Sequence, residues 1–278
     1  MRYAKYGTMA GMRQDRQSLV PQPEPLQFHR GCPDERLRPF VRNFWATQPV
    51  ETSHACRRQR IVPDGCIDII FTRNGPTETY KGYVVGTMTR PIFEDIAAGA
   101  QYLGIRFAAG GFTHLFGCPV HEFTDQTVPL DSLPRSSVSA DQIAGTPGVE
   151  ASFNILQDWL TQRLLQTRPC PVLWEALETI VACRGEVTVT QLAQAAGCSP
   201  RQLLRVFRES VGVGPKTYCR IVRFKIALRA LRRRPQRDLL QIALDAGYYD
   251  QAHFIHEFNA FYGASPSTVM SVSYNTRR

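Results

Sequence analysis

Short apolar runs separated by turn signals fill the first part of the chain. Residues 60–62, 66–71, 83–85 and 102–107 are β-type runs, and Pro63-Asp64-Gly65 stands between the first two as a turn. No long helical period separates the runs, which disfavours a parallel βαβ sheet. The pattern predicts an antiparallel β-rich domain, a sandwich or barrel, over residues 28–135, preceded by a polar, proline-rich tail at residues 1–27.

A helical period replaces the β-type alternation in the next segment. After a connection rich in Ser, Pro and Gly at residues 136–148, apolar residues three and four apart predict two flanking helices before residue 184. They could cover the β-rich domain or pair with a second copy of the chain, and the spacing does not decide between the two.

Residues 185–278 contain a short helix, a glycine and a second helix, in that order. Residues 190–196 are good helix formers that Gly197 ends, and Ser199 with Pro200 then begins a new helix in the order that helix starts prefer. Leu203, Val206 and Phe207 face inward in this second helix. The arrangement predicts a helix-turn-helix unit, whose second helix can enter a major groove.

The same order returns fifty residues later. Gly247 ends the helix over residues 239–246, Asp250 caps the next helix, and Phe254, Phe258 and Phe261 supply its buried side. Such an internal repeat predicts a second helix-turn-helix unit. The fold class is therefore α+β: an amino-terminal β-rich domain with flanking helices and a carboxy-terminal all-α domain with two helix-turn-helix units.

One helix from Pro215 to about Arg234 joins the two units. Its apolar stripe includes Tyr218, Val222 and Leu228, and its Lys and Arg residues, Lys225 among them, are expected outside that stripe. About twenty residues span on the order of 30 Å, close to the roughly 34 Å between successive major-groove faces of B-DNA. The spacer would hold two DNA readers on one side of a duplex.

The charge distribution supports a polyanion as the partner of this last part. The chain has a net charge of +9, of which +8 lies from Glu186 onward, where 14 Lys and Arg stand against 6 Asp and Glu. A solvated basic surface would have the same composition, so the helix-turn-helix pattern has to decide between the two. Neither a membrane span nor a secretory signal is visible, and eight dispersed cysteines suit a reducing cell, so we expect a cytoplasmic protein.

The carboxy-terminal ninety residues resemble the DNA-binding domain of the AraC/XylS family of bacterial transcription regulators. The matching residues in the second unit are Ile242-Ala243, Gly247-Tyr248, Asp250, Phe254, Phe258, Gly263 and Ser265-Pro266. Those before it are Leu192-Ala193, Ser199, Leu203, Arg205, Phe207, Gly212, Gly214-Pro215 and Arg223. Residues 60–130 resemble the amino-terminal domain of a poorly characterised branch of that family through Pro63-Asp64-Gly65-Cys66-Ile67-Asp68, Gly86-Thr87-Met88-Thr89-Arg90-Pro91, Gly104-Ile105-Arg106-Phe107 and Phe123-Thr124-Asp125.

The resemblance implies which residues meet DNA. Its base-facing positions fall on Arg201, Leu204, Arg205, Gln251, Ala252 and His256. Arginine suits guanine, Gln suits adenine, and Leu can meet a thymine methyl. Phosphate contacts are expected from Arg208, Lys216, Arg220, Arg223 and the run Arg232-Arg233-Arg234. The second unit departs from the family at His256, where Arg is common, so Arg201 and Arg205 are expected to supply more of the sequence discrimination.

Other chemistry has weaker support in the sequence. His114, Cys118 and His121 would share one helix face as a metal site needs, but Gly117 and Pro119 interrupt that helix, so no metal site is expected. Cys66 would be a redox-sensing thiol if a nearby cation lowered its pKa. Asp64 and Asp68 flank a turn and a strand, and nothing fixes them as an acid/base pair.

These features predict a sequence-specific, DNA-binding transcription regulator that is not an enzyme and carries no cofactor. The amino-terminal domain would sense a small molecule or dimerise, and RNA polymerase is a further partner open to such a regulator. One alternative is a regulator whose amino-terminal domain is an enzyme or a metal- or thiol-based sensor. Another is a structural DNA binder of the nucleoid type without sequence preference.

Overall fold

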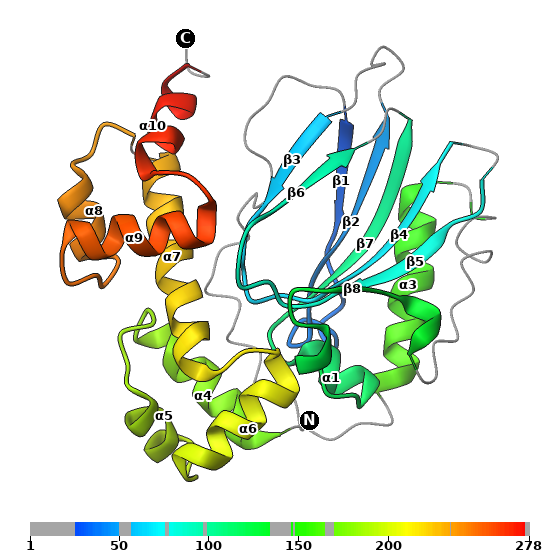
Figure 1. Ribbon diagram of the computed structural model, residues 1–278. Helices are drawn as coiled ribbons and strands as arrows, with labels where there is room; N and C mark the ends of the chain where they lie inside the picture. The colour runs from blue at the N-terminus through cyan, green and yellow to red at the C-terminus, as the bar shows by residue number, and fades with distance from the viewer. Residues whose placement is uncertain are drawn as a thin grey trace.

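The chain folds into a β-rich half and a helical half that pack against each other (Figure 1). The structure, a computed structural model, describes residues 26–49, 57–75, 78–96, 99–133, 146, 148–164, 170–233 and 235–275. Of the tail expected at residues 1–27, residues 1–25 lie outside the described residues, and residues 26 and 27 instead belong to the first strand, Leu26–Gly31. Of the connection expected at 136–148, only residues 146 and 148 are described. Among the helices in the described ranges, none is both long enough and apolar enough to cross a membrane.

Within the described ranges, eight antiparallel strands build the β-rich half. They are β1 (Leu26–Gly31), β2 (Val41–Pro49), β3 (Arg57–Ile61), β4 (Asp68–Asn74), β5 (Lys81–Val85), β6 (Ile92–Ile96), β7 (Ala100–Phe107) and β8 (Thr127–Pro129). Six of them form one sheet in the order β1-β2-β7-β4-β5-β8, and β3 pairs with β6 in a separate two-stranded sheet. The α+β class and the antiparallel pairing predicted from the sequence are confirmed.

Helices cover one face of the six-stranded sheet. This half also contains α1 (Gly111–Phe116), η2 (His121–Phe123), η3 (Leu130–Ser132) and α3 (Val149–Leu164). Phe44 of β2 stacks with Phe153 of α3 at 5.9 Å between ring centroids, and Phe116 of α1 meets Trp159 at 5.4 Å. The first of the two expected flanking helices thus covers the sheet. We call residues 26–164 the β-domain.

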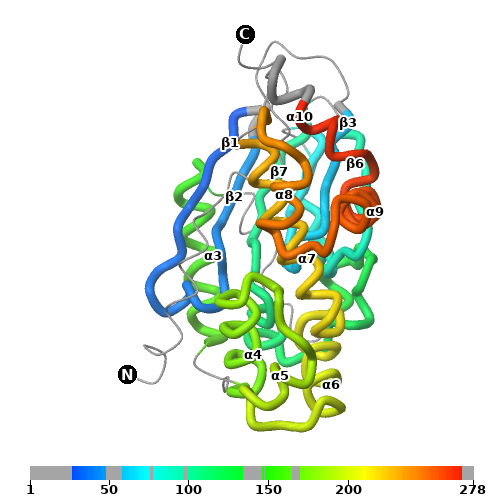
Figure 2. Tube along the Cα trace, turned by 90° about the vertical axis from the view of Figure 1, so that its left-hand side faces the viewer, coloured from blue at the N-terminus to red at the C-terminus, as the bar shows by residue number. Residues whose placement is uncertain are grey.

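The helical half contains α4 (Pro171–Ala182), α5 (Val189–Ala195), α6 (Pro200–Val211), α7 (Pro215–Arg233), α8 (Leu239–Asp245), α9 (Gln251–Tyr262) and α10 (Pro266–Asn275). The second expected flanking helix, α4, packs against α5, α6 and α7, so we group it with them as the helical domain, residues 170–275. In Figures 1 and 2 α7 runs along the β-domain, with α5 and α6 near one end and α8 to α10 near the other.

Candidate nucleic-acid interface

The first helix-turn-helix unit consists of α5 and α6. Gly197 has the left-handed φ of 63° that ends the preceding turn, and the Ser199 hydroxyl accepts a hydrogen bond from the backbone N–H of Gln202 at 3.2 Å. Leu203 and Phe207 are fully buried, and Val206 is half-buried against the core. The predicted turn, cap and buried stripe of this unit are therefore confirmed.

The predicted base-reading side of α6 faces solvent. Arg201 and Arg205 are exposed, and Leu204 keeps 43% of its surface accessible although it is apolar. An exposed leucine between two exposed arginines, one helical turn from the capped end, suits a groove that offers both hydrogen-bond acceptors and thymine methyls. Their contact with bases stays a prediction.

The second unit, α8 and α9, repeats this construction. Gly247 is left-handed at a φ of 78°, and the Asp250 carboxylate accepts the backbone N–H of His253 at 2.7 Å. Phe254, Phe258 and Phe261 are buried, as predicted. On the opposite side, the predicted base-facing residues are Gln251, which is half-buried, and Ala252 and His256, which are exposed.

Tyr249 is an exposed aromatic residue that the sequence reading missed. It lies directly before the Asp250 cap of α9 and has 86% of its surface accessible. Its place in the turn that leads into α9 puts it beside the predicted base-facing positions. Its position directly before the Asp250 cap was the available signal, but Tyr248 in the same turn is buried, so the sequence does not distinguish the two.

The predicted phosphate contacts fall into two groups. Arg208, Lys216 and Arg233 are exposed, whereas Arg232 is half-buried and Arg234 lies outside the described residues. Arg220 and Arg223, both on α7, instead lie against the buried carboxylate of Glu257 on α9, at 2.6 Å for Arg220 Nε and 3.8 Å for Arg223. These two ion pairs join α7 to α9, the second helix of the second helix-turn-helix unit.

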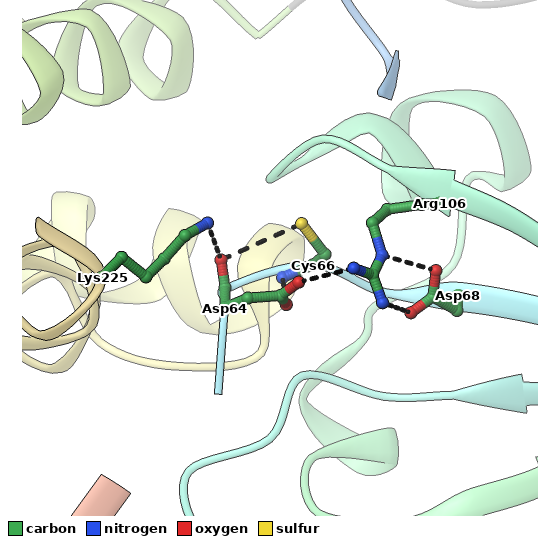
Figure 3. A network of polar contacts seen from close by, with 5 residues as sticks. All are labelled: Asp64, Cys66, Asp68, Arg106 and Lys225. Atoms are coloured by element: carbon green, nitrogen blue, oxygen red, sulfur yellow. Dashed lines mark hydrogen bonds and ion pairs between the residues drawn. The ribbon is translucent and has the colours of Figure 1, made fainter. Parts of the chain in front are cut away.

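Lys225 contradicts the expectation that it lies outside the apolar stripe of α7. It is 3% exposed, and its ammonium donates a hydrogen bond to the backbone carbonyl of Asp64 in the β-domain at 2.9 Å (Figure 3). Its place seven residues after Tyr218 and three before Leu228 puts it on the stripe itself, so spacing was a signal that its charge concealed.

The turn that accepts Lys225 is held in a buried ionic network. Arg106 on β7 binds Asp68 on β4 through two hydrogen bonds of 3.0 and 2.9 Å, and its other terminal nitrogen lies 3.2 Å from Asp64. Gly65 has a φ of 72°, and a Cβ there would come within 2.5 Å of the Tyr218 ring. The Pro63–Asp68 motif and the Gly104–Phe107 motif therefore meet where the two domains meet.

Burial and neighbouring charges shift the pKa values in this network. Burial, followed by the nearby charge of Arg42, lowers the pKa of Lys225 from 10.5 to about 8. Burial raises the pKa of the Cys66 thiol, outweighing the cations around it. The sequence allowed a reactive thiol if a cation lowered this pKa, and the surroundings of Cys66 do the opposite.

The three candidate metal ligands lie on different segments of the structure. His114 on α1 stacks flat on Phe40 at 4.1 Å between ring centroids, Gly117 ends α1 before Cys118, and His121 begins η2. Within the described ranges, no group of three His, Cys, Asp or Glu side chains is arranged to hold a metal ion.

Comparison with known proteins identifies the helical domain. A family described as a helix-turn-helix domain matches residues 192–271, and one described only as a domain of unknown function matches residues 29–129. A transcriptional activator of the XylDLEGF operon from Pseudomonas putida is 25% identical over 179 residues, covering 60% of this chain and 51% of that protein. The helical domain therefore contains a helix-turn-helix domain of the AraC type, and relatives of the chain are AraC/XylS-type transcription regulators.

Further similar proteins match shorter parts of the chain. An uncharacterised helix-turn-helix regulator from Haemophilus influenzae is 35% identical over 79 residues, covering 28% of this chain and 26% of that protein. A solved AraC-type regulator from Chromobacterium violaceum is 26% identical, with a TM-score of 0.35, covering 37% of this chain and 92% of that one. The chain spans between about a quarter and just over half of the length of the curated relatives it matches.

Proposed function

We propose that the whole chain is a sequence-specific, DNA-binding transcription regulator whose two recognition helices, α6 and α9, read successive major-groove faces of one duplex. The observation that carries this proposal is the repeated unit: two capped recognition helices, each with its predicted base-facing side open to solvent, at the two ends of α7. The 19 residues of α7 correspond to about 28 Å of helix, which is of the order of one turn of B-DNA.

In this proposal the two readers contribute unequally. Arg201 and Arg205 each present a guanidinium that can bind guanine O6 and N7, and each such pair discriminates by about 1–3 kcal/mol. The second reader presents Gln251, Ala252 and His256, which carry less positive charge. Exposed Arg208 and Lys216 neutralise phosphates and set the register without reading sequence.

The β-domain is the regulatory part of the proposal, and we assign it no enzymatic activity. A small-molecule effector or a second copy of the chain that binds there can change transcription only by favouring one arrangement of the two readers over another. The direct route for such an influence is the packed junction between the domains, where Lys225 and Tyr218 of α7 meet the Pro63–Asp68 turn.

Selection of duplexes from a random DNA pool by the full chain tests the proposal. We expect two conserved half-sites about 10 base pairs apart, since successive major-groove faces have that spacing. Arg205→Ala should relax the preference at one position, whereas the matched control Arg208→Ala on the same helix should weaken binding to all sequences alike. A pool without any motif would contradict the proposal and favour the nucleoid-type binder.

A further inference from the structure

The carboxyl end of the first recognition helix is closed by the β-domain. The last carbonyl groups of a helix have no partner within it, and around the end of α6 they belong to residues 209–212. Val120 donates its backbone N–H to the carbonyl of Glu209 at 2.8 Å, and the Thr124 hydroxyl donates to that of Gly212 at 2.7 Å. The hydroxyl of Thr87 donates to the carbonyl of residue 211, and that of Thr113 lies 3.3 Å from the carbonyls of residues 209 and 210.

Four β-domain residues therefore satisfy four consecutive carbonyls, and we call Thr87, Thr113, Val120 and Thr124 the α6 cap. Gly212 makes this approach close: its φ is 88°, and a Cβ there would come within 2.9 Å of the Thr124 hydroxyl. A side chain at this position would push the cap away from the helix end.

The two loops that carry Thr87 and Thr124 are fixed to each other. Asp125 donates its backbone N–H to the carbonyl of Thr87 at 3.1 Å, and its carboxylate accepts the backbone N–H of Thr89 at 2.7 Å. Gly86 lies so close to the carbonyl of Phe123 that a Cβ would overlap it. The Gly86–Pro91 motif and the Phe123–Asp125 motif, noted in the sequence without a function, meet at the α6 cap.

The capped end of α6 also adjoins the short turn that connects α6 to α7; we call this turn, residues 212–214, the joint. Only residues 212–214 separate α6 from α7, and Gly212 and Gly214 are two of them. Arg201 lies about ten residues, or about 15 Å of helix, from this joint. A tilt of about 10° at the joint would therefore move the reading end by about 3 Å, close to the rise of one base pair.

The cap and DNA do not compete for the same surface of α6. The β-domain contacts its carboxyl end, while Arg201, Leu204 and Arg205 near its amino end are exposed with the cap in place. The second reader also meets the β-domain at its carboxyl end, where the Arg60 guanidinium lies 4.3 Å from the centre of the Tyr262 ring.

We infer that the β-domain sets the angle of the first recognition helix, and that Thr87, Thr113 and Thr124 are positioning residues for DNA reading. The inference rests on the proposed function and places its regulation at the contact between the β-domain and α6. When the β-domain is docked, it holds α6 in the orientation that binds half-sites at one fixed spacing. Loss of the α6 cap leaves the side chains predicted to contact DNA unchanged but allows the angle between α6 and α7 to vary.

The test compares Thr87→Val/Thr124→Val with the wild-type full chain on the duplex recovered by selection, and on the same duplex with one base pair inserted between the half-sites. Valine keeps the shape of threonine and removes the donor. We expect the variant to bind the recovered duplex about tenfold more weakly and to lose much of the wild type's preference for the original spacing. Its binding to an unrelated duplex should stay unchanged.

Two matched variants separate positioning from general destabilisation. Thr87→Ser/Thr124→Ser keeps both hydroxyls and should restore affinity and spacing preference. Thr179→Val removes a similar hydroxyl-to-carbonyl bond inside α4, to Glu175, and should change neither. Deuterium exchange should rise at the last turn of α6 in the valine variant alone. If that double variant does not fold, Thr124→Val carries the test with the same expected signs.

Unchanged affinity and spacing preference in the valine variant would overturn the inference. Tighter binding would overturn it as well, because the cap would then restrain the reader instead of preparing it. Failure of the selection to return any motif would instead contradict the proposed function. The two failures are therefore distinguishable.

Discussion

Replacement of Lys225 by methionine tests whether the two domains are docked as described. The ammonium is 3% exposed, and the fall of its pKa from 10.5 to about 8 corresponds to a cost of about 3 kcal/mol for keeping it charged at neutral pH. Its hydrogen bond to the Asp64 carbonyl returns about 1.5–3 kcal/mol. Methionine removes both contributions, so at pH 7 the free energy of unfolding of the variant should lie between that of the wild type and about 1.5 kcal/mol above it.

The pH dependence makes this prediction specific. Between pH 8 and 10.5 the unfolded chain binds more protons at Lys225 than the folded chain, so this residue adds stability as the pH rises. From pH 7 to 9.5 the wild type should gain about 2 kcal/mol relative to Lys225→Met. Urea unfolding of both proteins at several pH values, followed by far-UV circular dichroism, measures the difference. Parallel pH profiles would show that Lys225 titrates as an exposed lysine and would refute the docked junction.

The remaining predictions concern the readers and their attachment. Arg205→Ala should weaken binding to the selected duplex by about 1–3 kcal/mol and leave thermal unfolding unchanged, as a gel-shift titration with an unfolding curve will show. Arg208→Gln should lower the slope of log K against log salt by about 0.9, the contribution of one phosphate, whereas Arg220→Gln should not, because Glu257 already pairs with Arg220. Glu257→Gln should destabilise the chain by about 2 kcal/mol in urea, less than for a fully buried pair because Arg220 is 34% exposed. Gly65→Val should cost about 2 kcal/mol or more, since the backbone is left-handed there and Tyr218 occupies the space; an unchanged midpoint would argue against the turn contact.

Local rules predicted the helical domain well, because each of its features depends on neighbouring residues. Ser199 and Asp250 cap the recognition helices as their residue types indicate, and Gly197 and Gly247 adopt the left-handed conformation that their positions require. Three phenylalanines at helical spacing in α9 are buried. These signals need no knowledge of the rest of the chain.

The junction between the domains was beyond such rules, because it joins residues far apart in sequence. Lys225 was expected outside the apolar stripe because a charged side chain normally faces water. Its burial is explained by the Asp64 carbonyl, 161 positions away in the sequence. Arg220 and Arg223 look like phosphate contacts until the buried Glu257 is placed beside them. In each case the sequence gives the charged residue but not the partner that neutralises or accepts it.

The hydrogen-bond acceptors at the junction explain why the sequence did not predict these contacts. The bonds from Lys225, Thr87, Thr113 and Thr124 across the domain boundary all end on backbone carbonyls. Every residue type offers such a carbonyl, so the acceptor side has no sequence signature, and only the donors can be recognised. Side-chain substitution at residues 209–211, whose backbone supplies three of these carbonyls, should therefore leave the bonds intact where the new side chain packs without strain. Loss of a donor instead leaves a carbonyl without its partner. Control of the first reader is thus concentrated in a few β-domain residues, far in sequence from the helix that they orient.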